Sequence, residues 1–363
     1  MKLLVRLRCF ICAECGVYWS EQVPETLAAP GSKLTCAAVN WALVSVVLDS
    51  LSINAAARNL GSAWNTVNTA VLEAGYQQLI SDPTRFDGVK TIGVDEHCWK
   101  RVGWRSDRFV TVIIDLTPRE VGRPARLLDM IPGRSKKVLK TWLESRDTKF
   151  RLNVKTVAMD GFTGYKTAVR EVLPSAVTVM DPFHVVQLAS DKITQCRQRL
   201  QQETTGRRGR KGDLLFQARR LLLTRNRLLE GTTAIKVDQI LTDPRYTPLV
   251  RIWSIYQAII QAYENPHKHK GRAKLASVID ALGNDVTKGI PELRSLARTL
   301  KRRRNDILAY FTHPHSSNGP SEAINGRLEH LRGIALGFRN LGNYILRSLL
   351  HTGGFKQHLQ PLL

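Results

Sequence analysis

Three aspartates in the middle of the chain follow short apolar runs, where their carboxylates could bind a cation. Asp95 follows "TIGV", Asp160 follows "KTVAM" and Asp181 follows "AVTVM". A carboxylate at the end of a buried strand is held rigidly and can point into the crevice at that edge of the sheet. Carboxylates gathered there repel one another unless divalent cations lie between them, and oxygen ligands suit Mg²⁺ or Mn²⁺. The pattern predicts metal-dependent phosphoryl transfer, whereas each aspartate taken singly is explained as simply by the start of a turn.

A fourth carboxylate, Glu322, lies in the stretch "SSNGPSEAINGRLEHLRGIALGFRN". Asn-Gly-Pro at 318–320 interrupts the chain, and a helix is expected to start near residue 321. On a period of 3.6 residues the helix has two distinct faces: Glu322, Asn325 and Glu329 on the polar one, and Ile324, Leu328 and Leu331 on the apolar one. Packing of the apolar face would leave Glu322 free to face the crevice, with Glu329 as a solvated surface charge. The attraction of acidic residues to a helix N-terminus explains Glu322 equally simply.

The segments that must position the three aspartates alternate between β-prone and helical patterns. The β-prone runs are "VKTIGVD", "FVTVIIDL", "PARLLDMI", "VKTVAMD" and "AVTVMD", with helices expected at 136–145 and over "GYKTAVREVL". Three consecutive strands followed by alternating helix and strand form the layout of a ribonuclease-H-like α/β domain with a mixed five-stranded sheet. Asp160 is preferred as the partner of Asp95 because its strand would lie beside the first, although spacing alone leaves Asp181 open.

The segment from 35 to 80 has a helical pattern typical of DNA-binding domains. "AAVNWALVSVVLDSL" predicts one helix, and "SINAAARNLG" a second, with Ser52 as its N-cap and Gly61 as its end. Ser62 could cap a third helix over "AWNTVNTAVLEAG". Two short helices separated by Gly-Ser are the pattern of a helix-turn-helix, whose second helix enters the major groove. The charge balance and the position of the segment favour this interpretation over an ordinary helical bundle. The residues expected near DNA are Trp64, Asn65, Asn68 and Thr69.

The charge balance also favours a polyanionic partner. Lys and Arg number 54 against 31 Asp and Glu, a formal net charge of +23 in 363 residues, and nucleic acid is the commonest partner of such a protein. Residues 186 to about 312 are mostly helical in pattern and strongly basic, so they offer either a solvated face or a phosphate-binding face. We find no apolar run long enough to span a membrane and no signal peptide, and we expect a cytoplasmic, nucleoid-associated protein.

Six cysteines in a chain this long do not suggest a disulfide framework. Cys36, Cys98 and Cys196 are scattered and are expected to be buried thiols. Cys9, Cys12 and Cys15 cluster in the first 30 residues, which end in the loop-like sequence "VPETLAAPGS". Three clustered cysteines without a nearby histidine fall short of the four ligands that close a structural zinc site.

Three long stretches give the chain a resemblance to the DDE transposases of the ISL3 group of bacterial insertion sequences. They are "TIGVDEHCWKR", "VAMDGFTGYKTAVREVLPSAVTVMDPFHVV" and "SNGPSEAINGRLEHLRGIALGFRN", and the resemblance runs from about residue 8 to 355. It implies that Asp95, Asp160 and Glu322 are the catalytic, metal-binding triad. "DPFHV" resembles an Asp-x-x-His element, which gives Asp181 and His184 a supporting role.

The resemblance also implies a domain plan and a set of partners. It implies a DDE domain over 88–355, interrupted by a helical insertion at about 190–312, and a zinc-binding module of which "CAECGVYWSE" retains only the pair Cys12 and Cys15, so that bound zinc is not expected. The chain would be truncated at its start, would begin earlier, or would have lost the finger. The implied activity is Mg²⁺- or Mn²⁺-dependent cutting at terminal inverted repeats and strand transfer into target DNA, by at least a dimer.

Four basic residues are candidate phosphate contacts on this DNA, each with a plain surface charge as the alternative: Lys100, Arg101, Arg303 and Arg327. His97 is expected to serve packing or DNA contact, and Glu96 to turn away from Asp95. Two other functions remain open from the sequence. One is a catalytically inactive remnant that binds DNA, and the other is a structure-specific nuclease of the ribonuclease-H superfold, which would cut without joining strands.

Overall fold

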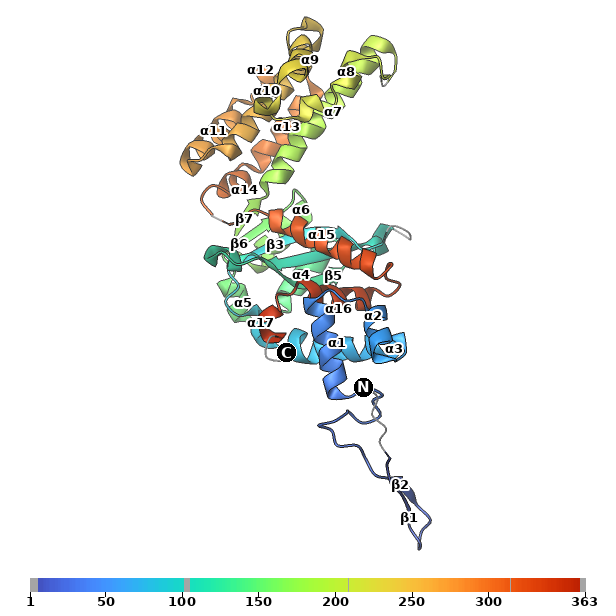
Figure 1. The fold of residues 1–363 in the computed structure, drawn as a ribbon. Coiled ribbons are helices and arrows are strands. Elements are labelled where there is room, and N and C mark those ends of the chain that lie inside the picture. The colour runs from blue at the N-terminus through green and yellow to red at the C-terminus, as the bar shows by residue number, and fades with distance from the viewer. Residues whose placement is uncertain (1–5, 101–104, 208, 314, 360–363) are drawn as a thin grey trace.

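The computed structural model describes residues 6–100, 105–207, 209–313 and 315–359, with the backbone alone for residues 105 and 106. A five-stranded mixed sheet forms its centre (Figure 1). The strands lie in the order β5-β4-β3-β6-β7. Their bounds are β3 (Thr91–Cys98), β4 (Phe109–Asp115), β5 (Arg126–Pro132), β6 (Thr156–Met159) and β7 (Val177–Met180). β4 is antiparallel to both its neighbours, whereas β6 and β7 run parallel to β3.

The chain order predicted for this region is confirmed. Three strands come first, then α4 (Lys136–Glu144), β6, α6 (Thr163–Val172) and β7, with α5 (Thr148–Asn153) as an additional short helix before β6. The strands form because their runs of Val, Ile and Thr suit a pleated surface that is covered on both faces.

The first strand is longer than the sequence predicted. Instead of ending at Asp95, β3 continues to Cys98, because β4 pairs with it as far as Cys98 opposite Phe109. The parallel partner β6 stops earlier, with Met159 opposite Val94. Asp95 therefore lies within the strand on its β4 side and just beyond the last pair on its β6 side.

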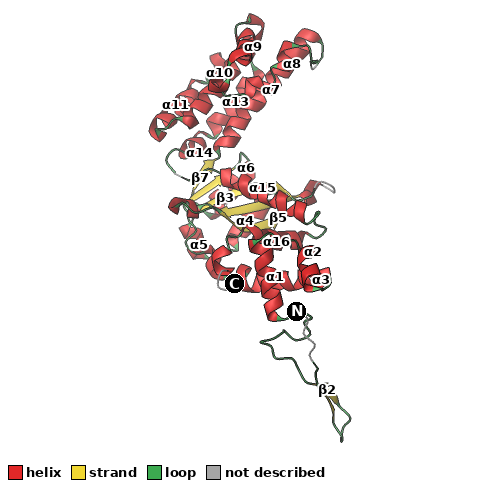
Figure 2. Cartoon of the chain, viewed as in Figure 1, coloured by secondary structure: helices red, strands yellow, loops and turns green. Residues whose placement is uncertain are grey.

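Helices cover both faces of the sheet (Figure 2). On one face, Ile92 and Val94 of β3 pack with apolar residues of α4 and α6. On the other face, β4 packs with α15 (Gly319–Ile334) and α16 (Leu341–Thr352), from the C-terminal part of the chain. The apolar stripe predicted for α15 is confirmed, since Ile324, Leu328 and Leu331 are all buried. The sheet is thus closed on one side by segments far from it in sequence.

Three helices precede the sheet: α1 (Cys36–Leu48), α2 (Ile53–Leu60) and α3 (Trp64–Gly75). As predicted, the Ser52 hydroxyl accepts a hydrogen bond from the backbone N–H of Ala55, and Gly61 ends α2 in the left-handed conformation. α3 begins after Ala63, which provides no side-chain cap, instead of after Ser62. Their core is completed by apolar residues of α16 and α17 (Lys356–Leu359), so the C-terminal helices join this bundle to the sheet.

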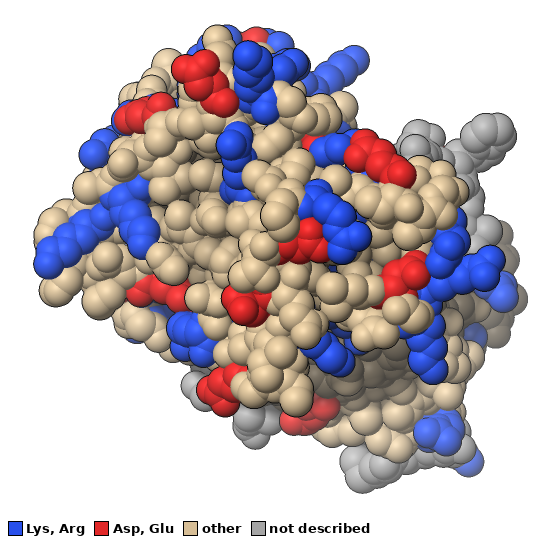
Figure 3. Space-filling model, turned by 90° about the horizontal axis from the view of Figure 1, so that it is seen from above, with Lys and Arg blue, Asp and Glu red and all other residues tan. Residues whose placement is uncertain are grey.

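A helical segment with a core of its own follows β7 and projects from the edge of the sheet (Figure 1). Its helices are α7 (Pro182–Thr205), α8 (Leu214–Gln217), α9 (Gly231–Leu241), α10 (Thr247–Glu264), α11 (Lys268–Ala281), α12 (Asn284–Thr287), α13 (Pro291–Arg302) and α14 (Arg304–Ala309). Seen from above, Lys and Arg are dispersed over the molecule with Asp and Glu between them (Figure 3). On this face the cationic excess therefore does not form a single patch.

The remaining elements are small. A hairpin of β1 (Cys9–Ile11) and β2 (Tyr18–Ser20) lies at the opposite end from the helical segment (Figure 1). Short helical turns are η1 (Tyr76–Ile80), η2 (Pro83–Phe86), η3 (Arg105–Arg108), η4 (Thr117–Val121), η5 (Leu221–Leu223), η6 (Asn226–Leu228) and η7 (Pro244–Tyr246). In the part of the chain that the structure describes, no helix is both long enough and apolar enough to cross a membrane.

Candidate active site

The three predicted aspartates lie at one level across three adjacent parallel strands. Val94 of β3 is opposite Met159 of β6, and Met159 is opposite Met180 of β7. Asp95 is the next residue of β3, and Asp160 and Asp181 directly follow β6 and β7. The sheet therefore brings together, at one edge, carboxylates that are up to 86 positions apart in the sequence (181 − 95 = 86).

Asp95 is a half-buried carboxylate held by two donors. One oxygen, Oδ1, accepts a hydrogen bond from the backbone N–H of Glu96 at 2.8 Å, and Oδ2 accepts one from Nδ2 of Asn325 on α15 at 3.1 Å. Burial raises the pKa of Asp95 to about 6; the Asp160 charge adds to this rise, whereas the Glu96 hydrogen bond and His184 oppose it. A carboxylate that is poorly solvated and repelled by a neighbouring carboxylate is stabilised by a bound cation.

Asp160 lies in the loop after β6, and that loop is fixed from the helical segment. Oδ1 of Asp160 accepts a hydrogen bond from the backbone N–H of Phe162 at 2.8 Å. The carbonyl of Gly161 accepts one from Nη2 of Arg303 at 2.7 Å, and Nη1 of Arg303 is 3.0 Å from Oδ2 of Asp306. Arg303 is only 3% exposed. Our prediction that Arg303 is a surface phosphate contact is therefore wrong, because its guanidinium is buried and already bonds to Gly161 and Asp306, which fixes the loop beside Asp160.

Asp181 is buried and joins two helices. It is 2% exposed and is the N-cap of α7, since its Oδ2 accepts a hydrogen bond from the backbone N–H of Phe183 at 3.0 Å. Its Oδ1 accepts one from the backbone N–H of Asn318 at 2.6 Å, immediately before α15. Burial raises the pKa of Asp181, and these hydrogen bonds oppose the rise. Both oxygens already have backbone donors, so the residue positions the start of α15.

α15 runs along β3 in close contact. A Cβ atom on Gly93 would lie 2.7 Å from Oδ1 of Asn318, so only glycine allows the helix to start this near the strand. Further along, Asn325 bonds to Asp95, and Nη1 of Arg332 donates to the carbonyl of Cys98 at 3.0 Å. The helix therefore follows the strand past Asp95 with its inner face towards the sheet.

Glu322 lies in the first turn of α15, one turn before Asn325. It is exposed and makes no hydrogen bond or ion pair with any residue that the structure describes. Among those residues, no three His, Cys, Asp or Glu side chains converge closely enough to hold a metal ion. The structure thus brings Asp95 and Asp160 together, whereas Glu322 stands apart on the adjacent helix.

One atom of this site was not anticipated from the sequence. Oδ1 of Asn325 is buried beside Asp95 and has no hydrogen-bond partner. A buried acceptor without a donor is costly unless something else satisfies it, and an amide oxygen beside the Asp95 carboxylate suits a hard cation. The oxygen-rich donor set therefore fits Mg²⁺ or Mn²⁺. The spacing of three residues between Glu322 and Asn325 was the available signal, because it puts both on one helical face.

His184, His97 and Glu96 lie near these carboxylates in the sequence, but each has a different environment. His184, half-buried on α7, lies close enough to lower the pKa values of both Asp95 and Asp181. His97 is buried, with Nε2 2.7 Å from the Tyr344 hydroxyl, and burial lowers its pKa to about 4, so it serves packing. Glu96 points to the other face of β3, as predicted, where its Oε2 is 2.9 Å from Nη1 of Arg134.

The comparison with known families identifies this arrangement. Residues 92–348 match the family of DDE transposases of the ISL3 group, described as transposase. The chain belongs to the ISL3 family of transposases. The match begins at the second residue of β3 and ends in α16, so it contains the rest of the sheet, the helical segment and α15.

Two curated transposases are similar to the chain. It is 26% identical over 312 residues to the transposase for insertion sequence element IS1001 of Bordetella parapertussis, an alignment that covers 84% of this chain and 70% of that protein. It is 27% identical over 313 residues to the transposase for insertion sequence element IS1557 of Mycobacterium tuberculosis, covering 82% and 67%. Both alignments extend beyond the part of this transposase that matches the family.

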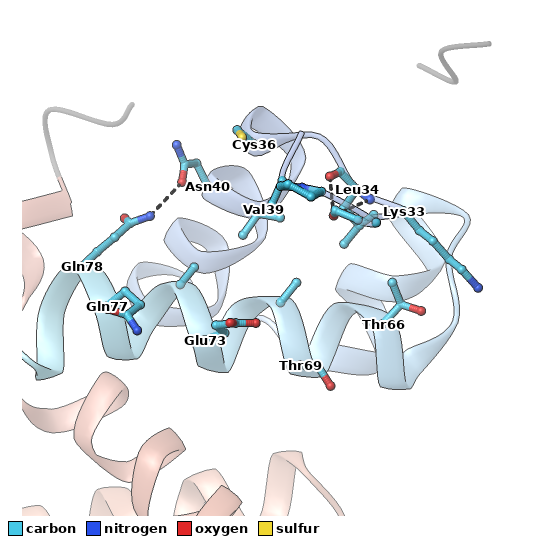
Figure 4. A pocket seen from close by; sticks show the side chains of 16 residues that line it. Lys33, Leu34, Cys36, Val39, Asn40, Thr66, Thr69, Glu73, Gln77 and Gln78 are labelled. Carbon is cyan, nitrogen blue, oxygen red and sulfur yellow. Dashed lines mark hydrogen bonds between the residues drawn. The ribbon is translucent and has the colours of Figure 1, made fainter. Parts of the chain in front are cut away.

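The predicted DNA-contacting residues of α3 are only partly at the surface. Trp64, Asn65 and Thr69 are exposed, whereas Asn68 is buried at 8% exposure and cannot present its amide to DNA. The correction follows from packing, since Asn68 lies beside Val67 and Val71, which are buried in the core of the bundle. A hollow of about 570 Å³ lies between the loop at 29–34, α1 and α3 (Figure 4). Thr69 and Glu73 of α3 are among its lining residues.

The other basic residues and cysteines singled out from the sequence differ in their surroundings. Lys100 places Nζ 4.8 Å from the ring centroid of Trp99, and Arg327 is exposed on α15. Arg101 lies outside the described residues. Cys12 and Cys15 adjoin in the turn of the β1–β2 hairpin, where hydrogen bonds from the backbone and thiol of Cys15 lower the pKa of Cys12.

Proposed function

We propose that this transposase cuts DNA at the ends of an insertion sequence and joins the freed 3′ ends to target DNA, on a ribonuclease-H-like catalytic core. The observation that carries the proposal is the pair Asp95, within β3, and Asp160, directly after the adjacent parallel strand β6, with the buried, unpartnered Asn325 oxygen beside Asp95. The names of the two similar proteins, each a transposase for an insertion sequence element, agree with it.

In this proposal Asp95, Asp160 and Glu322 hold Mg²⁺ or Mn²⁺. A metal held there would supply activation of an attacking water or 3′ hydroxyl and stabilisation of the leaving oxygen of the phosphodiester. Asn325 fixes the Asp95 carboxylate through its Nδ2 donor, and Asp181 and Arg303 hold α15 and the Asp160 loop in place. No protein nucleophile is needed, because water and the DNA hydroxyl are the attacking groups.

DNA binding is assigned to the helical bundle at the start of the chain. α2 and α3, joined by a three-residue turn, would act as a helix-turn-helix that recognises the terminal inverted repeats, with Trp64, Asn65 and Thr69 on the exposed side of α3. Lys100 and Arg327 would contact phosphates. Joining two ends requires them to be held together, so at least a dimer would form on DNA. The hairpin with Cys12 and Cys15 is not assigned a zinc ion.

The test is cutting and joining of a short duplex that carries the element's own end, in Mg²⁺ or Mn²⁺, with binding of the same duplex measured in parallel. We expect cutting at the end sequence and a joined product. Binding without cutting would identify a DNA-binding remnant. Cutting of branched duplexes without joining would identify a nuclease.

The pKa of Asp95 predicts how this activity depends on pH. Because burial raises that pKa to about 6, Asp95 is mostly ionised at pH 7 and mostly protonated at pH 5. A protonated carboxyl binds metal poorly, so the cutting rate at limiting Mg²⁺ should fall by about tenfold for each pH unit below about 6. DNA binding, measured at the same pH values, should not fall with it. A rate that stays constant down to pH 4.5, where an ordinary aspartate is still ionised, would contradict a metal-binding role for Asp95.

A further inference from the structure

Arg347 is a buried arginine without a partner. It lies on α16 and is 5% exposed, yet its guanidinium makes no hydrogen bond or ion pair with any residue in the described ranges. Other buried arginines have partners for their guanidinium groups: Nη1 and Nη2 of Arg85 donate to the carbonyls of Ile80 and Leu128, and Arg303 pairs with Asp306. Burial lowers the pKa of Arg347 to about 10, so it still carries its charge at neutral pH. Such a charge is unfavourable without a counter-ion.

The groups around Arg347 are basic as well. His351 is four residues further along the same helix and is half-buried. Burial lowers the pKa of His351, and the nearby charges of Arg347, His330, Arg327 and Lys356 lower it further. The side chains that lower the pKa of His351 are thus all basic residues, and they come from α15, α16 and α17. We call these five residues, Arg327, His330, Arg347, His351 and Lys356, the basic cluster.

The basic cluster has the composition of an anion site. Cations crowded together raise one another's energy, and here a buried guanidinium has no carboxylate in ion-pair contact among the described residues. A guanidinium presents a planar fork of donors that matches phosphate oxygens. Exposed Arg327, His330 and Lys356 would let a phosphate approach from solvent.

The position of the basic cluster indicates which kind of phosphate group it binds. α16 packs against α1 and α3, the bundle assigned to DNA binding, and α15 passes Asp95 on its other side. We propose that the basic cluster binds a backbone phosphate of duplex DNA at a point between the bundle of α1, α2 and α3 and the carboxylates of Asp95 and Asp160. This inference rests on the proposed function, since it presumes that the chain binds DNA there.

The first arm of the test compares Arg347→Met with Arg85→Met by thermal unfolding of the full chain. A purely structural arginine is destabilising to remove, as expected for Arg85, whose two carbonyl partners would be left unpaired. Methionine at 347 removes an uncompensated charge instead, so the Tm in phosphate-free buffer should stay the same or rise. Inorganic phosphate should raise the Tm of the unaltered protein at matched ionic strength and should not raise that of Arg347→Met.

The second arm measures affinity for a short duplex against salt concentration. Arg347→Met should bind about tenfold more weakly, because a hydrogen-bonded charge pair with phosphate is lost. The slope of log affinity against log salt should decrease in magnitude by about 0.9, the value for one phosphate contact. Arg245→Gln, which alters an exposed arginine paired with Asp243 in the helical segment, should change neither.

Three results would overturn the proposal. The first is a loss of Tm for Arg347→Met as large as for Arg85→Met, which would make Arg347 structural. The second is phosphate protection through Arg347 with unchanged duplex affinity and slope, which would assign the cluster to a free anion. The third is that neither the unaltered protein nor Arg245→Gln binds the duplex. This result would overturn the proposed function as well, and it differs from the other two because every variant then fails to bind.

Discussion

Glu322→Gln is expected to abolish strand cutting and joining while the affinity for the same DNA stays unchanged. Glutamine keeps the size of the side chain but removes the negative charge that would hold a divalent cation. Glu322 is exposed and has no partner among the described residues, so the exchange removes no contact of the folded chain. The rate should fall on the order of 10³-fold or more, as for other essential catalytic groups. The measurement is cleavage of an end-labelled duplex in Mg²⁺, with binding followed by a gel shift.

Glu329→Gln provides the matched control, because Glu329 lies on the same helix two turns further on. It is ion-paired with Arg332 and lies 4.0 Å from His97, away from Asp95. Cutting by this variant should equal that of the unaltered protein. Normal cutting by Glu322→Gln would remove Glu322 from the metal site, and an equal loss in both variants would point to the helix as a whole instead of to one carboxylate.

Asp181→Ala is expected to lower both the free energy of unfolding and the cutting rate. The change removes the N-cap of α7 and the acceptor for the Asn318 backbone N–H, two hydrogen bonds to a buried carboxylate. Leaving these donors unpaired should cost roughly 3 kcal/mol, measured by urea denaturation. Cutting should slow as well, because Asn318 immediately precedes the helix that carries Glu322.

Asp147→Ala is the control for capping alone. Asp147 caps α5 through one hydrogen bond to the backbone N–H of Phe150, and it lies at the surface. Its loss should cost only about 1 kcal/mol and leave cutting unchanged. If Asp181→Ala loses no more stability than Asp147→Ala, or still cuts at the full rate, then Asp181 does not anchor α15.

Much of the fold could be predicted because its determinants are local. The runs of β-branched residues predict the five strands, and the signals at Ser52 and Gly61 place α2 correctly. The period of α15 separates its buried stripe from Glu322 and Asn325. In these cases hydrophobic periodicity and capping act within a few residues.

The errors fall where distant segments meet. β3 continues past Asp95 because β4 pairs with it as far as Cys98. The residues near Asp95 in the sequence give no indication of how long the partner strand is. Arg303 lies in the run "KRRRND", which is typical of a solvated surface, yet it is buried against Gly161 and Asp306. Asn68 is buried by packing within the bundle that α1, α2 and α3 form with α16.

The sequence by itself determined the order of the strands and helices and the family of the chain, and it singled out the candidate carboxylates. Each of these follows from the spacing of hydrophobic residues over short segments or from motifs of neighbouring residues. Only the tertiary structure decided that β3 extends past Asp95, that Asp181 holds the backbone before α15, and that Arg347 is buried without a counter-ion. Burial, pKa and partners depend on which residues pack together across the sheet, and that neighbourhood exists only once the chain has folded.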